Sequence, residues 1–332
     1  MNFSIFGAGA WGTAMSIHLC RNGQNVTLVP RRYEQALALT SERENKLYLP
    51  GVPLENQIQI ACEPKPALME SEVILVACPV AGLTELGQTL SNSLDSAWRA
   101  HTFLTLCKGW EAENSLPPPT YLKSQLPGHH IGVLSGPNNA REIANGKPAA
   151  IVLATQENPQ AKAIQLALSN ENLRVYTSTD VEGVSLGGAL KNIYAIGAGI
   201  CSGLELGDNA IAAFLTRALN EMVRLGTALG GQPETFYGLS GFGDLIATST
   251  GPWSRNRTFG NEIGKGVAVE NLLQDRCTVV EGYKATQTFH GICQARGIDA
   301  PILKETHGVL FDGRPPAIAL RKLMNRDLKA ES

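Results

Sequence analysis

Hydrophobic positions follow two different periods along this chain, and the change between them divides it in two. In the first part, short apolar runs alternate with stretches of helical spacing, which predicts a parallel sheet with helical crossovers. Several runs are nearly all apolar, as expected of strands covered on both faces. The predicted strands are Phe3–Phe6, Val26–Val29, Ile58–Ala61, Val73–Ala77, Thr102–Leu106, Ile131–Leu134, Ala150–Ala154 and Arg174–Tyr176.

The pattern changes around Thr177–Asp180. Beyond this point the apolar spacing is helical, and no segment has convincing strand character. Thr179 or Asp180 is suited to cap a long helix at the transition. The chain is therefore expected to form an α/β domain over residues 1–178 and an all-α domain over residues 179–332.

Composition agrees with two globular domains and excludes several classes of protein. The 332 residues are 43% hydrophobic and 17% charged, and the net charge of -2 argues against binding to nucleic acid or to acidic membranes. The seven cysteines form no CxxC pair or metal-ligand cluster, which predicts a reduced cytoplasmic protein without a metal site. Glycines interrupt the apolar segment Met1–Cys20, and no run of about 20 apolar residues predicts a membrane span.

A glycine-rich motif, GAGAWG, follows the first predicted strand and precedes a predicted helix, Thr13–Arg21. In this setting G-x-G-x-x-G is typical of a Rossmann-type dinucleotide site. Gly7 permits the tight turn, Gly9 lets a pyrophosphate approach the backbone, and Gly12 lets helix and strand pack closely. The helix N-terminus then offers N–H groups to the phosphates. A plain glycine turn is the alternative.

The second strand ends in Arg31 and Arg32, and no acidic residue occurs before Glu34. An NAD-specific site normally has a carboxylate here for the ribose 2′-hydroxyl. Two guanidinium groups suit a 2′-phosphate instead, which indicates that NADP is accepted. The alternative is a solvated basic turn.

Lys191 is the strongest candidate for acid–base chemistry. It is predicted to lie inside the helix that starts near Asp180, with Gly187 and Gly188 one turn away. Glycines weaken a helix, so their presence favours a close approach to the backbone beside the lysine. A ligand beside a functional lysine can make that approach. The alternative is a surface lysine that extends to solvent beside glycines used for helix–helix packing, and the spacing does not decide between them.

Other polar groups cluster among glycines. Asp244 follows a Gly-Phe-Gly sequence and can balance a lysine, and Arg255 and Asn256 can clamp a phosphate. Lys108 follows a predicted strand at the end where α/β sheets bind ligands, and the segment 136–139 leaves another strand to begin a helix. A loop with solvated charges is the alternative for each.

Taken together, these segments resemble the NAD(P)-dependent sn-glycerol-3-phosphate dehydrogenases of the bacterial type. The matching stretches, in order, are GAGAWGTA, NKLYLPG, CKG, GPNNAREIANGKPAA, LGGALKNIYAIGAGI, GDNAIAAFLTRALNEM, GFGDLIATSTGPWSRNRTFG and VVEGYKAT. The resemblance implies reversible reduction of dihydroxyacetone phosphate to sn-glycerol 3-phosphate with NADP(H) or NAD(H), supplying glycerophospholipid synthesis. It also implies a homodimer.

The resemblance further assigns roles to residues. Lys191 is expected to be the proton donor and acceptor. The expected substrate contacts are Lys108, Gly136, Asn138, Lys191, Asp244, Ser254, Arg255 and Asn256. The expected cofactor contacts are Gly7, Gly9, Ala10, Trp11, Gly12, Arg31, Arg32, Tyr48, Lys108, Ala140, Arg255, Val279 and Glu281.

This sequence departs from the family pattern in places. Cys107 stands where Thr or Ser is usual, Asn138 where Ser or Thr is usual, and Ala10 where Ser is frequent. A carboxamide can still donate a hydrogen bond to the substrate, but with a different reach. Two other functions compete: a hydroxy-acid or ketopantoate-type reductase acting on a carboxylate, and a nucleotide-sensing protein without catalysis. Arg255 with Asn256 favours a phosphate over the first, and Lys108, Lys191 and Asp244 together speak against the second.

Overall fold

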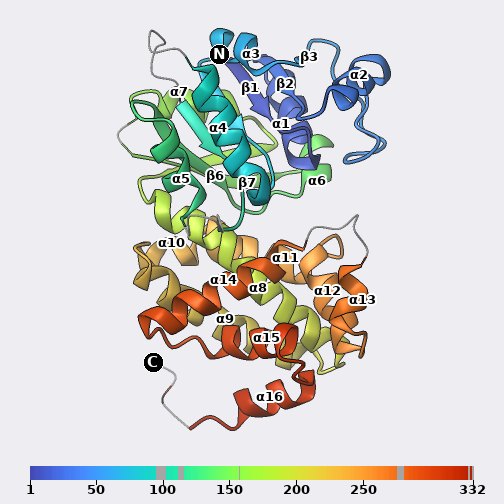
Figure 1. The fold of residues 1–332 in the computed structure, drawn as a ribbon, viewed down its shortest axis with the longest axis vertical. Helices are drawn as coiled ribbons and strands as arrows, with labels where there is room; N and C mark the ends of the chain where they lie inside the picture. The colour runs from blue at the N-terminus through green and yellow to red at the C-terminus, as the bar shows by residue number, and fades with distance from the viewer. Residues whose placement is uncertain (95–101, 111–115, 157, 275–279, 328–329, 331–332) are drawn as a thin grey trace. The chain divides into compact units, whose positions relative to one another are not determined.

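The computed structural model describes residues 1–94, 102–110, 116–156, 158–274, 280–327 and 330. The chain forms two compact units, Met1–Ser185 and Leu186–Ser332 (Figure 1). The predicted boundary at residue 178 coincides with the end of the last strand, and as a domain limit it stays a prediction.

The first unit is built on one eight-stranded sheet, with a strand at each predicted position. Its strands lie in the order β3-β2-β1-β4-β5-β6-β7-β8. The first six follow the 3-2-1-4-5-6 order of a Rossmann fold. Their bounds are β1 Asn2–Phe6, β2 Asn25–Val29, β3 Gln59–Ile60, β4 Val73–Val76, β5 Thr102–Thr105, β6 His130–Ser135, β7 Ala149–Thr155 and β8 Leu173–Ser178.

The expectation of a wholly parallel sheet is wrong at one place. Strand β7 pairs antiparallel with β6, while β8 is parallel to β7. A parallel return needs a crossover that carries the chain back along the whole sheet. Here the connection holds only the short helix α6 (Ala140–Ala144) and a turn at Gly146, whose φ is +69°. The chain therefore re-enters the sheet from the end at which β6 left it.

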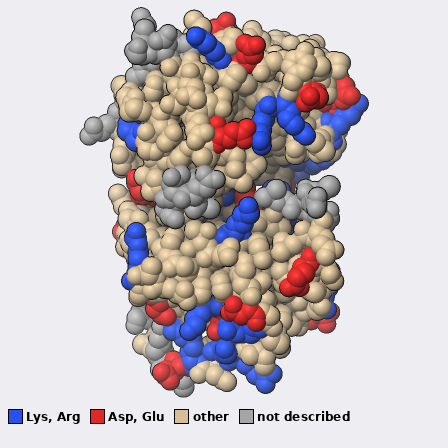
Figure 2. Space-filling view, viewed as in Figure 1, with Lys and Arg blue, Asp and Glu red and all other residues tan. Residues whose placement is uncertain are grey.

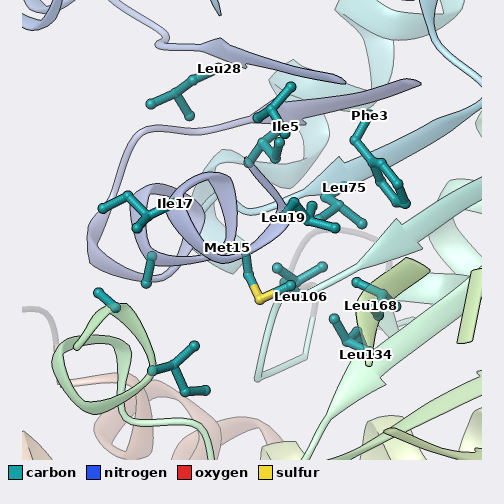
Figure 3. Close-up of a cluster of buried hydrophobic side chains, with 14 of the residues drawn as sticks. Phe3, Ile5, Met15, Ile17, Leu19, Leu28, Leu75, Leu106, Leu134 and Leu168 are labelled. Atoms are coloured by element: carbon teal, nitrogen blue, oxygen red, sulfur yellow. The ribbon is translucent and has the colours of Figure 1, made fainter. Parts of the chain in front are cut away.

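Helices cover both faces of this sheet. Strand β4 explains the unbroken apolar runs: Val73 and Leu75 belong to one hydrophobic cluster, while Ile74 and Val76 belong to another. Figure 3 shows the first cluster, in which Met15 of α1 lies among strand residues. That cluster includes residues of α1 (Ala10–Arg21), α6 and α7 (Ala161–Leu168), and the other includes residues of α3 (Pro64–Glu70), α4 (Leu83–Ser93) and α5 (Pro118–Gln125).

Helix α1 begins earlier than the sequence suggested. It starts at Ala10 rather than at Thr13, so Gly12 lies inside its first turn. A Cβ at Gly12 would lie 2.0 Å from the carbonyl oxygen of Gly7. The helix can therefore begin directly against the glycine loop only because residue 12 has no side chain. It ends before Gly23, as predicted, where φ is +72°.

The second unit is helical, and its described residues contain no strand, which confirms the all-α prediction. Asp180 provides the predicted cap, since its Oδ1 accepts a hydrogen bond of 2.9 Å from the backbone N–H of Gly183. The helices are α8 Val181–Gly203, α9 Asp208–Ala228, α10 Pro233–Tyr237, α11 Asp244–Thr250, α12 Arg255–Gly264, α13 Val269–Leu273, α14 Glu281–Arg296, α15 Pro301–Phe311 and α16 Pro316–Met324.

Helix α8 is the central element of this unit. Its length and mean hydropathy would suffice to cross a membrane, and of the described helices it alone passes that test. The whole of its apolar window is buried within the fold, which is how the core helix of a globular domain behaves. Its apolar surface is therefore explained by packing.

Glycines bring α8 and α12 into backbone contact. A Cβ at Gly199 of α8 would lie 2.1 Å from the carbonyl oxygen of Arg257, and one at Gly260 of α12 would lie 2.0 Å from that of Ile196. Neither position can hold a larger residue without moving a helix. This close approach fixes where the N-terminus of α12 lies relative to α8.

Charged side chains of both signs are interspersed on the face seen in Figure 2. Exposed ion pairs between residues close in sequence also occur, such as Lys265 with Glu262 at 2.9 Å. Pairs of this kind contribute little to stability. Among the described residues in that view, acidic side chains interrupt the basic ones, unlike the basic stripe that a phosphate backbone attracts.

Candidate active site

A cavity of about 490 Å³ opens in the first unit at the carboxyl ends of β1, β2 and β4. This is the end at which open α/β sheets bind ligands. Five of the expected cofactor contacts line it: Gly7, Gly9, Arg31, Arg32 and Tyr48.

The glycine loop at this cavity fits a dinucleotide pyrophosphate. Gly7 has φ +112°, and a Cβ there would lie 2.7 Å from the carbonyl oxygen of Ala77, so a side chain is excluded. A Cβ at Gly9 would meet no atom within 4 Å, which leaves the loop open on that side. No side chain caps α1, and its first turn holds no acidic residue. Its N–H groups and dipole therefore favour a bound anion.

The two arginines after β2 differ in their surroundings. Arg32 is exposed, and its side chain has no hydrogen-bond or ion-pair partner among the residues that the structure describes. Arg31 instead forms an ion pair with Glu85, with 2.8 Å between Nη2 and Oε2. Sequence reasoning missed this carboxylate, because Glu85 belongs to α4 and reaches the β2 end only through the fold.

A polar cluster forms where β5 and β6 end. Lys108 Nζ donates to the carbonyl oxygen of Gly136 at 2.9 Å and to Asn138 Oδ1 at 2.5 Å. Asn138 Nδ2 is buried and has no hydrogen-bond partner among the described residues. An unsatisfied buried donor is costly, so this amide is suited to an acceptor on a ligand. The side chain of Cys107 does not join this cluster, because its Sγ donates to the carbonyl oxygen of Cys78 at 3.0 Å.

In the second unit, Lys191 lies on α8 with only 5% of its surface exposed. Its Nζ is 2.8 Å from Asp244 Oδ1 and 2.6 Å from Thr248 Oγ1. Asp244 is 1% exposed, so this is a buried ion pair rather than a surface lysine. Thr248 was not predicted, although its spacing of four residues from Asp244 on a helix was a usable signal.

Gly187 explains how Asp244 reaches the lysine. A Cβ at Gly187 would lie 2.7 Å from the carbonyl oxygen of Ser240, in the π-helical turn Leu239–Gly243 that leads into α11. The glycine beside Lys191 therefore accommodates protein backbone and not a ligand, which settles the open alternative for this position. This turn places Asp244 at the start of α11, within hydrogen-bonding distance of Lys191.

The expected phosphate-binding residues lie at the start of α12, in different roles. Ser254 is the N-cap, and its Oγ accepts from the backbone N–H of Arg257 at 3.2 Å. Arg255 is exposed and unpaired within the described part of the chain. Asn256 is 8% exposed, and both polar atoms of its side-chain amide form hydrogen bonds. Its Nδ2 donates to Asn192 Oδ1 at 2.9 Å, and its Oδ1 accepts from the backbone N–H of Gly282 at 3.0 Å.

Asn192 was not predicted, although it follows Lys191 directly. Its Oδ1 holds Asn256, and its Nδ2 donates to Glu281 Oε2 at 3.4 Å. A network of side chains thus joins three helices, α8, α12 and α14. It brings together Glu281, an expected cofactor contact, and Asn256, an expected substrate contact.

The remaining expected cofactor contacts lie outside the cavity lining. Ala10 and Trp11 are in the first turn of α1, and Ala140 begins α6. The Trp11 indole N–H is buried and unpartnered among the described residues. Val279 lies outside the residues that the structure describes.

The strand order and the open glycine loop place this chain among the Rossmann-type dinucleotide-binding proteins. Two family models narrow the class. "NAD-dependent glycerol-3-phosphate dehydrogenase N-terminus" matches residues 2–161, and the corresponding C-terminus matches residues 180–321. The chain belongs to the NAD-dependent glycerol-3-phosphate dehydrogenase family.

Individual proteins agree with this assignment. The chain is 42% identical to a glycerol-3-phosphate dehydrogenase [NAD(P)+] of Thermoanaerobacter sp., over 100% of this chain and 99% of the relative. It is 39% identical to one from Salinibacter ruber, over 100% and 97%. The crystal structure of glycerol-3-phosphate dehydrogenase from Coxiella burnetii is 35% identical, with a TM-score of 0.91 and 98% of each chain covered. These matches extend over both units and not over the Rossmann unit alone.

Proposed function

We propose that this protein catalyses the reversible NAD(P)H-dependent reduction of dihydroxyacetone phosphate to sn-glycerol 3-phosphate, which supplies glycerophospholipid synthesis. The observation that carries the proposal is the burial of Lys191 in the helical unit. A buried ammonium with a buried carboxylate partner at 2.8 Å loses much hydration free energy, so it is a poor way to stabilise a fold and is better explained by a functional role.

Lys191 acts as the proton donor and acceptor. The nicotinamide cofactor supplies the hydride for the ketone carbon. The Lys191 ammonium donates a hydrogen bond to the carbonyl oxygen, polarises it and supplies the proton that the new hydroxyl requires. Asp244 and Thr248 hold the Nζ atom in position, at 2.8 and 2.6 Å. In the reverse direction the lysine accepts the hydroxyl proton.

Other polar residues are proposed as further substrate contacts. Arg255 is the main phosphate ligand, because its exposed guanidinium has no protein partner in the described structure and can form two parallel bonds. Asn138 donates from its unsatisfied amide. The other proposed substrate contacts are Lys108, Gly136, Ser254 and Asn256.

The cofactor is held by the glycine loop and the arginines. Gly7, Gly9 and Gly12 shape the loop, the N–H groups at Ala10 and Trp11 bind the pyrophosphate, and Arg32 with Arg31 binds a 2′-phosphate. The other proposed cofactor contacts are Tyr48, Lys108, Ala140, Arg255, Val279 and Glu281.

The domain limits, 1–178 and 179–332, are retained as part of the proposal because the family models end at 161 and begin at 180. A cytoplasmic location and a homodimer rest on the likeness to the bacterial enzymes. Size-exclusion chromatography with light scattering tests the dimer.

The reaction is tested by following NADPH oxidation at steady state with dihydroxyacetone phosphate. We expect saturable turnover with this substrate and none with ketopantoate, which carries a carboxylate in place of the phosphate. Turnover of ketopantoate alone would contradict the proposal. Binding of NADPH without turnover of either ketone would favour a nucleotide-sensing protein.

A further inference from the structure

The cofactor cavity has one acidic side chain among its lining residues, and that side chain is paired with an arginine expected to bind the 2′-phosphate. Glu85 and Arg31, which both line the cavity, form an ion pair of 2.8 Å. We propose that Glu85 is a specificity-determining residue, which competes with the NADP 2′-phosphate for Arg31 and so moderates the preference for NADP over NAD. The inference rests on the cofactor site proposed above.

The competition follows from charge. A 2′-phosphate needs the Arg31 guanidinium, so its binding must break the pair with Glu85 and bring two anions near each other. A 2′-hydroxyl needs no cation and leaves the pair intact. Glu85 therefore weakens NADP binding and leaves NAD binding unchanged. Arg32, which has no partner in the described structure, offers its charge without such competition.

The effect is modest because the pair is exposed. The side chains of Arg31 and Glu85 are 73% and 61% exposed, and water screens their attraction. An exposed pair worth at most about 1 kcal/mol corresponds to a change in affinity of roughly two- to fivefold. Glu85 thus adjusts the preference and does not reverse it.

Glu85 has a second role to separate from this one. It lies in the first turn of α4, where a negative charge stabilises a helix through its dipole. A residue with only that role would change the unfolding temperature when substituted. It would not change the discrimination between phosphorylated and unphosphorylated ribose.

The test measures binding in the absence of substrate. Adenosine 2′,5′-bisphosphate and adenosine 5′-phosphate differ only in the 2′-phosphate and are titrated calorimetrically into the full-length protein. We expect Glu85→Gln to tighten the bisphosphate about two- to fivefold and to leave the monophosphate unchanged. Glu34→Gln is the matched control, since Glu34 is exposed, lies three residues from Arg31 and does not line the cavity.

A double-mutant cycle isolates the pair. In an Arg31→Ala background, Glu85→Gln should no longer change the affinity for the bisphosphate. An effect of the same size in that background would overturn the proposal, as would equal tightening of both nucleotides. Because no ketone is present, a failed reaction assay does not alter the outcome. Loss of all nucleotide binding in the unmutated protein would instead refute the cofactor site itself.

Discussion

Lys191 and Asp244 depend on each other, and this determines how the catalytic proposal can be tested. Both side chains are buried, so removing one leaves the other as an uncompensated charge. A broken buried pair typically costs about 3–5 kcal/mol of stability. A single substitution can therefore lose activity because the protein unfolds, and a charge-neutral double variant is needed beside it.

We expect Lys191→Ala and the double variant Lys191→Ala/Asp244→Asn both to lower kcat by about 10²–10⁴-fold, because each removes the positioned acid. Affinity for NADPH should stay near that of the unmutated protein, as measured by quenching of protein fluorescence. Lys265→Ala, at the exposed residue that follows α12, is the control and should keep full activity. Turnover of the double variant within about fivefold of the unmutated protein would remove Lys191 from the chemistry.

Arg255 offers a second test at the level of one residue. Arg255→Lys keeps the charge but replaces a planar fork with a point charge. Losing one charge-assisted bond costs about 1.5–3 kcal/mol, so KM for dihydroxyacetone phosphate should rise tenfold or more. Arg321→Lys, in an exposed position on α16, is the control. If only the affinity for cofactor falls, Arg255 binds the dinucleotide and the substrate phosphate is held elsewhere.

Among the elements, α8 and α12 show that glycines determine how closely helices pack in the helical unit. Gly260→Ala would place a Cβ about 2.0 Å from the carbonyl oxygen of Ile196 and force the helices apart. We expect overpacking to cost about 1–3 kcal/mol, which lowers Tm by several degrees. Displacement of the α12 N-terminus should also raise KM for the phosphate substrate.

Gly291→Ala is the matched control for that substitution. Gly291 also lies inside a helix, α14, but a Cβ there would meet no atom within 4 Å. Alanine should therefore stabilise the protein slightly, by about 0.5–1 kcal/mol, because it favours the helix. Thermal unfolding of both variants measures the two shifts of Tm. Equal shifts of Tm in the same direction would show that helix propensity, and not packing, controls both positions.

The existence of each strand could be read from the sequence, but the direction of β7 could not. Apolar runs identify buried strands, yet the same run fits a parallel or an antiparallel neighbour. The same limit applies at the sites. Motifs on one segment, such as the glycine loop and Lys191, were found. Partners that lie far away along the chain, such as Glu85 for Arg31, depend on how the elements pack.

At the scale of the whole molecule, one buried group in each unit couples stability to pH, and the two act in opposite directions. Burial lowers the pKa of His18 in the first unit, so the folded state holds this ring neutral. Below its ordinary pKa of about 6.5 the unfolded chain binds an additional proton, and stability falls as pH falls. In the second unit, burial raises the pKa of Glu221 to about 7. The folded state then binds the additional proton, and stability falls as pH rises from about 4.5 to 7.

Substitution of Glu221 separates its contribution from that of His18. Glu221 is 1% exposed and accepts 2.8 Å bonds from the backbone N–H groups of Ile302 and Leu303 at the start of α15. Glu221→Gln removes its titration and leaves that of His18 untouched. The Tm of the unmutated protein minus that of Glu221→Gln should therefore decrease between pH 5 and 7.5 and then level off. For the exposed Glu234→Gln the difference should stay constant. A difference that stays constant from pH 5 to 7.5 would mean that the α15 N-terminus holds Glu221 ionised throughout this range, against the effect of burial.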